Sequence, residues 1–283
     1  MNLKANQDWM AGLSIPDHSI ADKGVTIGAV VLYSTNDYDY FNLCINNLLD
    51  CGISSIVVVT CSRMWNGDEE NQELMEQSIK LYADNPKVEF IKIPWVPDMK
   101  PFYFENIGRE MGVSFIQNKC DFVLLIDTDE IIDPYTFSIW LNTYDISRYK
   151  AIGLKQYFYM KSAIYRAKTC DDYNVVLFNT KYANKKRYGN ARRRFLNYDN
   201  KISRWLTKLG VHPKYKLQKD DLIFIHHYSW VKTKEQLLKK VNNWGHREDR
   251  KDWASVVNNI IDKNEFEGEY IIVNNIFNIK TNL

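Results

Sequence analysis

The sequence predicts an α/β fold in which a mostly parallel sheet is flanked by helices. Short apolar runs alternate with segments of helical periodicity through the first half of the chain. One run, Phe-Val-Leu-Leu-Ile at 122–126, is apolar throughout, which is typical of a strand buried on both faces. The chain has 283 residues, of which 45% are apolar, so it can also build an extensive core.

The first two expected strands, 25–34 and 55–60, enclose an expected helix over 38–50. An apolar stripe at helical spacing indicates this helix, and Gly52 is placed to cap its C-terminal end. The stripe consists of Tyr38, Phe41, Ile45, Leu48 and Leu49.

The first half continues with a helix over 68–84, a strand over 88–95, a helix over 103–118 and the strand over 122–126. The helix over 68–84 begins with acidic residues and carries Met75, Ile79 and Tyr82 on one face. Prolines close the strand that follows it. The next helix is indicated by a stripe of Phe104, Ile107, Met111 and Phe115.

Four β–α units joined by right-handed crossovers give a parallel, doubly wound sheet. The simplest strand order, 3-2-1-4, brings the end of the first strand beside the end of the fourth. Ser34, Thr35 and Asn36 follow the first strand, and Asp127 and Asp129 follow the fourth. Open α/β sheets bind ligands at such a point, where the strand order reverses.

The second half predicts strands over 150–160, 173–179 and 222–225. Thr233 then begins a helix, with Gln236 completing a capping box. We expect residues 1–149 and 150–283 to be two halves of one domain, the second being a mixed α+β extension of the same sheet.

Three acids, Asp127, Asp129 and Glu130, end the fourth strand. Asp133 and Pro134 already supply the cap of the next helix, which leaves these acids without an evident structural role. Carboxylates at a bend in the chain can share Mg²⁺ or Mn²⁺ that bridges phosphate oxygens. Neither a Gly-x-Gly-x-x-Gly motif nor a Walker lysine motif is present to hold phosphates by a glycine loop.

His226 and His227 follow the strand over 222–225, and His246 lies further along the chain. Adjacent residues of an extended segment point to opposite sides. We therefore expect one of the pair to face the metal as a ligand and the other to pack or to form hydrogen bonds. His246 could reach a diphosphate, although placement on the surface fits equally well.

The charge of the chain is unevenly distributed. Its net charge is only +2, yet 181–208 contains ten basic residues and one acid, so this segment carries +9 and the remainder −7. The basic residues are Lys181, Lys185, Lys186, Arg187, Arg192, Arg193, Arg194, Lys201, Arg204 and Lys208. Interleaved aromatic residues favour a polyanionic partner, and a solvated basic loop is the alternative.

The N-terminus lacks the pattern of a secretory signal, and no apolar run approaches the ~20 residues that span a bilayer. The five cysteines, at 44, 51, 61, 120 and 170, include no Cys-x-x-Cys pair. These features predict a soluble cytoplasmic protein with reduced thiols and no transmembrane segment.

Three segments together resemble the GT-A nucleotide-sugar glycosyltransferases, and the family-2-like group most closely. They are Ile-Asp-Thr-Asp-Glu at 126–130, Ile-His-His-Tyr-Ser-Trp-Val at 225–231 and Lys-Lys-Val-x-Asn-Trp-Gly-His at 239–246. The resemblance covers residues 25–250. It implies a GT-A (Rossmann-like) fold and transfer of a sugar from a nucleoside-diphosphate sugar, with a UDP-sugar favoured, to a hydroxyl acceptor.

The resemblance also implies roles for single residues. Asp127 would lie near the ribose or the metal, Asp129 would ligate Mn²⁺ or Mg²⁺, and His226 or His227 would complete the metal site. Residues 34–37 and Cys61-Ser62-Arg63 would hold the base and ribose.

The chain departs from the family pattern at two points. The segment Thr60-Cys61-Ser62-Arg63 lacks the Asp that commonly reads uracil, which leaves the base open. The usual Arg-Asn pair reads Glu105-Asn106 here, with Arg109 one turn later.

An inverting transfer needs a carboxylate that takes the proton of the acceptor hydroxyl. Asp171 and Asp172, between two expected strands, are the first candidates. Asp220 and Asp221 are the second candidates, although they could serve only as turn residues.

Three hypotheses remain open for the acceptor side. The acceptor is a glycan or lipid-linked sugar in the first. In the second it is a hydroxymethylated pyrimidine in DNA, as for bacteriophage DNA glycosyltransferases, and the basic segment follows the phosphodiester backbone. The residues that would contact the acceptor are Lys186, Arg187, Arg192, Arg193 and Arg194. The third hypothesis, an inactive nucleotide-sugar-binding module, is disfavoured by the intact Asp127 and Asp129 pair.

Overall fold

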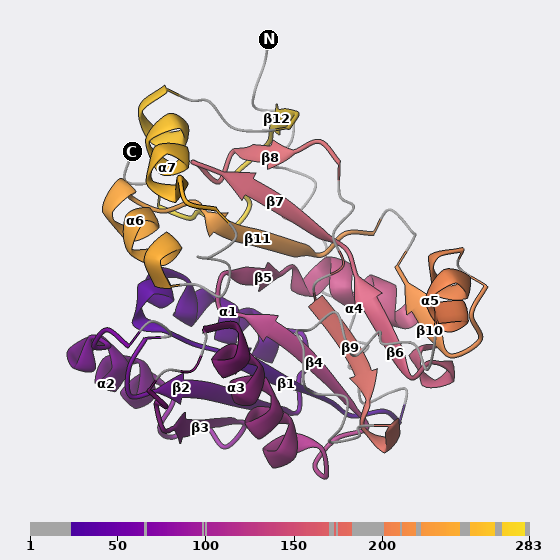
Figure 1. Ribbon diagram of the computed structural model, residues 1–283. Coiled ribbons are helices and arrows are strands. Elements are labelled where there is room, and N and C mark those ends of the chain that lie inside the picture. The colour runs from indigo at the N-terminus through magenta and orange to yellow at the C-terminus, as the bar shows by residue number, and fades with distance from the viewer. Residues whose placement is uncertain are drawn as a thin grey trace.

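The computed structural model describes residues 24–64, 67–97, 99, 101–169, 173, 175–182, 201–209, 211–218, 222–243, 250–263 and 268–280. Within these residues the chain forms an α/β structure with two sheets (Figure 1). Its helices are α1 (Tyr38–Asp50), α2 (Gln72–Leu81), α3 (Pro101–Ile116), α4 (Pro134–Thr143), α5 (Lys201–Lys208), α6 (Lys234–Asn243) and α7 (Trp253–Lys263).

The larger sheet contains seven strands in the described part of the chain. In spatial order they are β10 (Tyr215–Leu217), β6 (Ala151–Leu154), β9 (Val175–Asn179), β4 (Phe122–Asp127), β1 (Ile27–Leu32), β2 (Ser55–Cys61) and β3 (Val88–Ile93). Strands β4, β1, β2 and β3 are parallel, which confirms the predicted strand order. Because β9 runs antiparallel to both β4 and β6, the sheet as a whole is mixed.

The second sheet has five strands among the described residues. Their order is β12 (Tyr270–Ile272), β8 (Tyr165–Ala167), β7 (Gln156–Met160), β11 (Ile225–Trp230) and β5 (Glu130–Ile132). The chain passes from the larger sheet to this one between β4 and β5, between β6 and β7, and between β10 and β11. The acids after β4 therefore lie at the junction of the two sheets.

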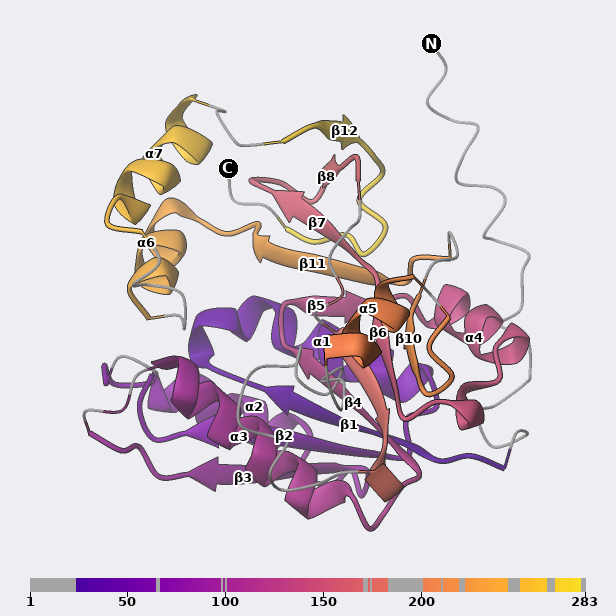
Figure 2. The same cartoon turned by 45° about the vertical axis from the view of Figure 1, so that its right-hand side comes forward.

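Both faces of the central strands β4, β1 and β2 are buried, which explains their uninterrupted apolar runs. Alternate residues of β1 belong to two separate core clusters, Ile27, Ala29 and Val31 to one and Val30 and Leu32 to the other. Helix α1 belongs to the first cluster and lies between the two sheets, whereas α3 covers the opposite face (Figure 2).

Helix α3 presents a different face to the sheet from the one predicted. Met111 and Phe115 of the expected stripe are 44% and 45% exposed. Gly112 instead faces the sheet so closely that an added Cβ would clash with the side chain of Val30. The apolar pattern failed here because a glycine, rather than a large side chain, makes the closest contact.

The first two helices begin and end at capping residues that can be compared with the predicted helix bounds. Helix α1 has the predicted bounds, and Gly52 adopts a φ of +75° directly after its end. Helix α2 begins at Gln72 instead of 68, because the side chain of Asn71 caps it by accepting the N–H of Leu74. Ile79 of its expected apolar face is 39% exposed.

The second half differs more from expectation. The predicted strand over 150–160 is two strands, β6 and β7, in different sheets. The predicted strand over 222–225 is wrong in its bounds, because the strand, β11, begins at Ile225 and continues through the polar and aromatic residues that follow. The capping box is confirmed: Thr233 donates its N–H to Gln236, and its hydroxyl accepts the N–H of Gln236.

Along the part of the chain that is described, none of the helices combines the length and the apolar character that crossing a membrane requires.

Candidate functional site

The carboxyl ends of β1 and β4 lie side by side at the point where the strand order reverses. Leu32 pairs with Asp127 in the parallel register of the two strands. The hydroxyl of Thr128 donates to the carbonyl oxygen of Leu32 at 2.7 Å, which fastens the two strand ends together. The predicted meeting of the loop after β1 with the acids after β4 is thus confirmed.

Glu130 has a structural role that the sequence did not indicate. Its Oε2 atom accepts the backbone N–H of Asp127 at 2.8 Å, and its side chain is fully buried in β5. This bond stabilises the turn that carries the chain from β4 to β5. Glu130 therefore shapes the site, whereas Asp127 and Asp129 face charged partners.

Asp127 is held by Arg109 of α3. The Nη2 atom of Arg109 lies 3.2 Å from Oδ1 and 3.4 Å from Oδ2 of Asp127. Its Nη1 atom lies 3.8 Å from Oε2 of Glu105. The Asp127 side chain is 26% exposed, compared with 4% for Asp129. Asp127 is thus the acid of this pair that a ligand reaches first.

Asp129 lies between a lysine and a histidine. The Nζ atom of Lys240 is 2.6 Å from its Oδ2, and the Nε2 atom of His227 is 3.4 Å from its Oδ1. Burial alone would raise the pKa of the Asp129 carboxyl, but Lys240 and His227 outweigh burial and hold that pKa well below its usual range. Burial lowers the pKa of Lys240, but Asp129 and Asp37 outweigh it and raise that pKa. Asp129 and Lys240 therefore form an ionised pair.

Lys232 holds the loop after β1 against the second half of the chain. Its Nζ atom lies 2.6 Å from Oδ1 of Asp37 and donates to the carbonyl oxygen of Asn36 at 3.2 Å. The same ammonium lies 4.6 Å from the centre of the Tyr40 ring, within the range of a cation–π contact. The Lys232 side chain is 2% exposed, so it serves to position this loop.

Neither Lys232 nor Lys240 was predicted from the sequence to be a site residue. Lys232 directly precedes the capping box, and Lys240 lies in the last turn of α6. Both follow β4 by more than a hundred residues, so their position depends on the pairing of β11 with β5. One signal was present: Lys240 lies beside the apolar positions Leu237 and Val241 on the helix, where an exposed lysine is not expected.

The two adjacent histidines have different surroundings, as strand alternation predicts. Nδ1 of His226 lies 2.8 Å from the Tyr159 hydroxyl within the core, and burial, with a smaller effect of Arg166, lowers the pKa of His226 to about 3. His227 instead faces Asp129. Burial opposes protonation of His227, but Asp129 outweighs it and raises the His227 pKa. Of the pair, His227 is the histidine that the structure brings to the acids.

The residues of the predicted base-binding segments form hydrogen bonds within or near their own loops. Thr35 is buried, and both its N–H and its hydroxyl donate to Oε2 of Glu70, a contact that the sequence did not indicate. The Ser34 hydroxyl accepts the N–H of Asn36 at 3.5 Å. Arg63 donates to the carbonyl oxygen of Gly67, and its guanidinium lies 5.7 Å from the centre of the Trp95 ring.

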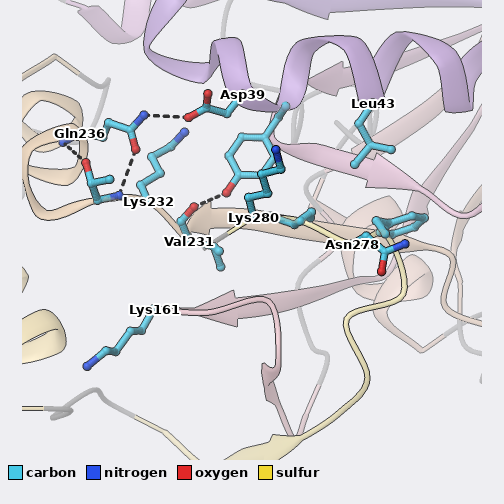
Figure 3. A pocket seen from close by; sticks show the side chains of 12 residues that line it. Asp39, Leu43, Lys161, Val231, Lys232, Gln236, Asn278 and Lys280 are labelled. Carbon is cyan, nitrogen blue, oxygen red and sulfur yellow. Dashed lines mark hydrogen bonds between the residues drawn. The ribbon is translucent and has the colours of Figure 1, made fainter. Parts of the chain in front are cut away.

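A pocket of about 320 Å³ adjoins the charged residues around Asp37 and Asp129. Lys232, which contacts Asp37, and Tyr40, whose ring lies beside Lys232, both line this pocket. Figure 3 shows the amide of Gln236 donating to Asp39. The Tyr40 hydroxyl donates to the carbonyl oxygen of Val231. Leu43 and Phe277 contribute apolar surface to the lining. A pocket that combines apolar walls with a few polar groups suits a small polar ligand.

Several predicted site residues lie outside the described residues. They are the base candidates Asp171, Asp172, Asp220 and Asp221, the basic residues Lys186, Arg187, Arg192, Arg193 and Arg194, and His246. Their predicted roles stay predictions.

The residues around Asp129 do not form a ready cradle for Mn²⁺ or Mg²⁺. In the described ranges no group of three or more His, Cys, Asp or Glu side chains lies close enough to share a metal ion. The two oxygens of Asp129 already face Lys240 and His227, and Asp127 faces Arg109. The described donors thus do not fit a resident divalent cation, and the expected metal site stays a prediction.

No protein-family model matches this chain, and no curated protein matches its sequence. The geometry of the site and the sequence motifs therefore carry the functional argument.

Proposed function

We propose that this protein is a glycosyltransferase that moves a sugar from a nucleoside-diphosphate sugar to a hydroxyl acceptor. One observation carries the proposal: Asp127 and Asp129 lie with Arg109, Lys240 and Lys232 where β1 and β4 end side by side. Open α/β sheets bind their ligands at this position. The resemblance to GT-A enzymes over residues 25–250 supports the same conclusion.

The charges of the cluster suit a diphosphate leaving group. In the reaction, the bond between the anomeric carbon and the β-phosphate oxygen breaks, and its electron pair stays on that oxygen. The acceptor oxygen forms the new bond to the anomeric carbon, and its proton passes to a carboxylate. Positively charged side chains fixed beside the departing phosphate stabilise its growing charge. Arg109 and Lys240 are the cations proposed for this task.

Asp127 is proposed to bind the ribose of the donor. Its carboxylate is held in place by Arg109 yet remains partly exposed, so it can accept hydrogen bonds from hydroxyl groups. The base would lie against the loop after β1. At the end of β2, where an aspartate would read uracil, the chain has Thr60, whose hydroxyl donates to the carbonyl oxygen of Ile91. This position therefore offers no carboxylate to the base. A UDP-sugar thus remains one donor among several to test.

The acceptor is proposed to be a glycan or a lipid-linked sugar. The pocket beside Tyr40 and Lys232 offers hydrogen-bonding groups, such as Asp39 and Gln236, next to apolar surface. Sugars combine hydroxyl groups with apolar C–H faces, so this lining suits part of a saccharide. The catalytic base is proposed to be Asp171 or Asp172.

The proposal is tested by incubating the protein with a panel of nucleotide-sugars, with and without Mn²⁺, and measuring the nucleoside diphosphate released. Asp127→Asn should lower turnover by at least roughly tenfold, since it weakens a hydrogen bond to a charged group. Glu89→Gln is the matched control, because Glu89 lies on β3 in an exposed pair with Lys119 and should be silent.

Equal turnover in the Asp127→Asn and Glu89→Gln proteins would contradict the placement of the donor site. Absence of turnover with every donor, combined with tight binding of a nucleotide-sugar, would favour the inactive binding module. Turnover that requires hydroxymethylated DNA would favour the DNA acceptor.

A further inference from the structure

Lys240 occupies a position between two strand ends where a bridging cation would lie. Its Nζ atom is 2.6 Å from Oδ2 of Asp129, which follows β4, and 4.0 Å from Oδ1 of Asp37, which follows β1. A divalent cation shared by carboxylates from these two strand ends would contact the same oxygens. Lys240 and such a cation therefore compete for one position.

We infer that the ammonium group of Lys240, in place of a divalent cation, provides the positive charge that faces the donor's diphosphate. The inference rests on the proposed function and names the residue that stabilises the leaving group. It follows from the occupied state of Asp129, whose two oxygens face Lys240 and His227. A dication in contact with Asp129 would lie directly beside the ammonium, and repulsion between like charges disfavours that arrangement.

Lys240 suits this role better than Lys232 does. The Lys232 side chain is 2% exposed and is committed to Asp37, Asn36 and the Tyr40 ring. The Lys240 side chain is 14% exposed, so a ligand in the crevice can reach it. An ammonium group has three N–H donors. Lys240 can therefore donate to a phosphate oxygen while one N–H stays with Asp129.

Asp129 and Asp37 are then positioning residues. They hold the ammonium at the junction of the two sheets, much as acidic ligands would hold a metal. As the bond between the sugar and the β-phosphate oxygen breaks, Lys240 donates a hydrogen bond to a phosphate oxygen and keeps its proton. Such a fixed cation stabilises the charge of the leaving group without reorganising.

A direct test is titration of the nucleotide-free protein with Mn²⁺, followed by the electron paramagnetic resonance signal of free Mn²⁺. The wild-type protein should not bind Mn²⁺ stoichiometrically. Lys240→Gln should bind it, because the carboxylates of Asp129 and Asp37 lose the competing ammonium. Lys239→Gln, the same change at the exposed neighbouring position on α6, should behave like the wild type. Stoichiometric Mn²⁺ binding by the wild-type protein overturns the inference.

A second readout is the binding of UDP, GDP and CDP in the presence of EDTA, measured by calorimetry. The wild-type protein should bind at least one of them without a metal. Lys240→Gln should weaken that binding roughly 10- to 100-fold, as expected for a lost hydrogen bond to a charged group. Lys240→Arg, which keeps the charge, should restore part of it. Loss of wild-type binding on addition of EDTA, or equal binding by Lys240→Gln and Lys239→Gln, overturns the inference.

Removing Lys240 leaves a buried carboxylate beside fewer positive charges, so Lys240→Gln could unfold. The double variant Asp129→Asn with Lys240→Gln removes both charges and tests diphosphate binding in a neutral site, where the same weakening is expected. The wild-type measurements need no variant at all. If the wild-type protein binds none of the nucleoside diphosphates either with Mn²⁺ or with EDTA, the proposed function fails, whereas the Mn²⁺ titration still decides between Lys240 and a metal.

Discussion

Single residues of the site differ in how far the sequence revealed them. The acids Asp127 and Asp129 were predictable, because carboxylates at the end of a buried strand have few structural uses. Lys232, which pairs with Asp37, was not predictable, since a lysine that precedes a helix looks like a solvated residue in sequence. For Lys240, the partner of Asp129, the sequence held one sign, its place beside Leu237 and Val241. The identity of His227 as the histidine beside Asp129 also required the structure, because alternation shows only that the two histidines differ.

His226 gives a prediction about stability at acid pH. Its surroundings are Tyr159, Tyr157, Tyr228, Phe277 and Arg166, and burial lowers its pKa to about 3. The unfolded chain binds a proton at this histidine below its ordinary pKa of about 6.5, whereas the folded chain does not. The free energy of unfolding is therefore unaffected by this histidine above pH ~6.5, and it decreases as the pH falls below that value, by up to about 1.4 kcal/mol per pH unit.

Urea unfolding of the wild type and of His226→Gln between pH 7.5 and pH 4.5 checks this effect. The wild type should lose stability more steeply than the variant as the pH falls, because the variant lacks the titrating group. Since His227 is present in both proteins, its raised pKa cancels in the comparison. Parallel pH profiles for the two proteins would show that His226 is not held neutral.

At the level of elements, helix α3 is fixed by a close approach of backbone to sheet. Gly112 lies against Val30 of β1 and Val59 of β2, and this contact sets the rotation of the helix that carries Arg109. The expected stripe of Met111 and Phe115 failed for the same reason. Periodicity locates a helix well, but the face that packs depends on shape when small residues permit a closer approach.

Gly112→Ala should therefore destabilise the protein by roughly 1–3 kcal/mol, the usual cost of overpacking a well-filled core. The better helix propensity of alanine offsets about 1 kcal/mol at most. The control is Ser114→Ala on the exposed side of the same helix, which should change stability little. Urea midpoints measure both effects, and a Gly112→Ala protein as stable as Ser114→Ala would refute the close packing of α3.

For the whole molecule, the sequence predicted the parallel half of the larger sheet and the meeting of the loop after β1 with the acids after β4. Local patterns are sufficient there, because the strands are mostly apolar and each is joined to the next by a single β–α unit. The second sheet could not be predicted in the same way. Strand β11 is rich in His, Tyr and Ser, and it pairs with β5 and β7, which are distant in sequence. The cations that β11 and α6 bring to the site were missed for this reason.

The central claim is that a nucleoside diphosphate binds where β1 and β4 end side by side. The most direct test is backbone hydrogen exchange of the wild-type protein with and without the tightest-binding nucleoside diphosphate. We expect added protection in segments 33–40, 127–132 and 232–241, and unchanged exchange at the opposite end of the sheet, in 84–88 and 118–122. Unchanged exchange in the first set, with protection confined to other segments, would contradict the account.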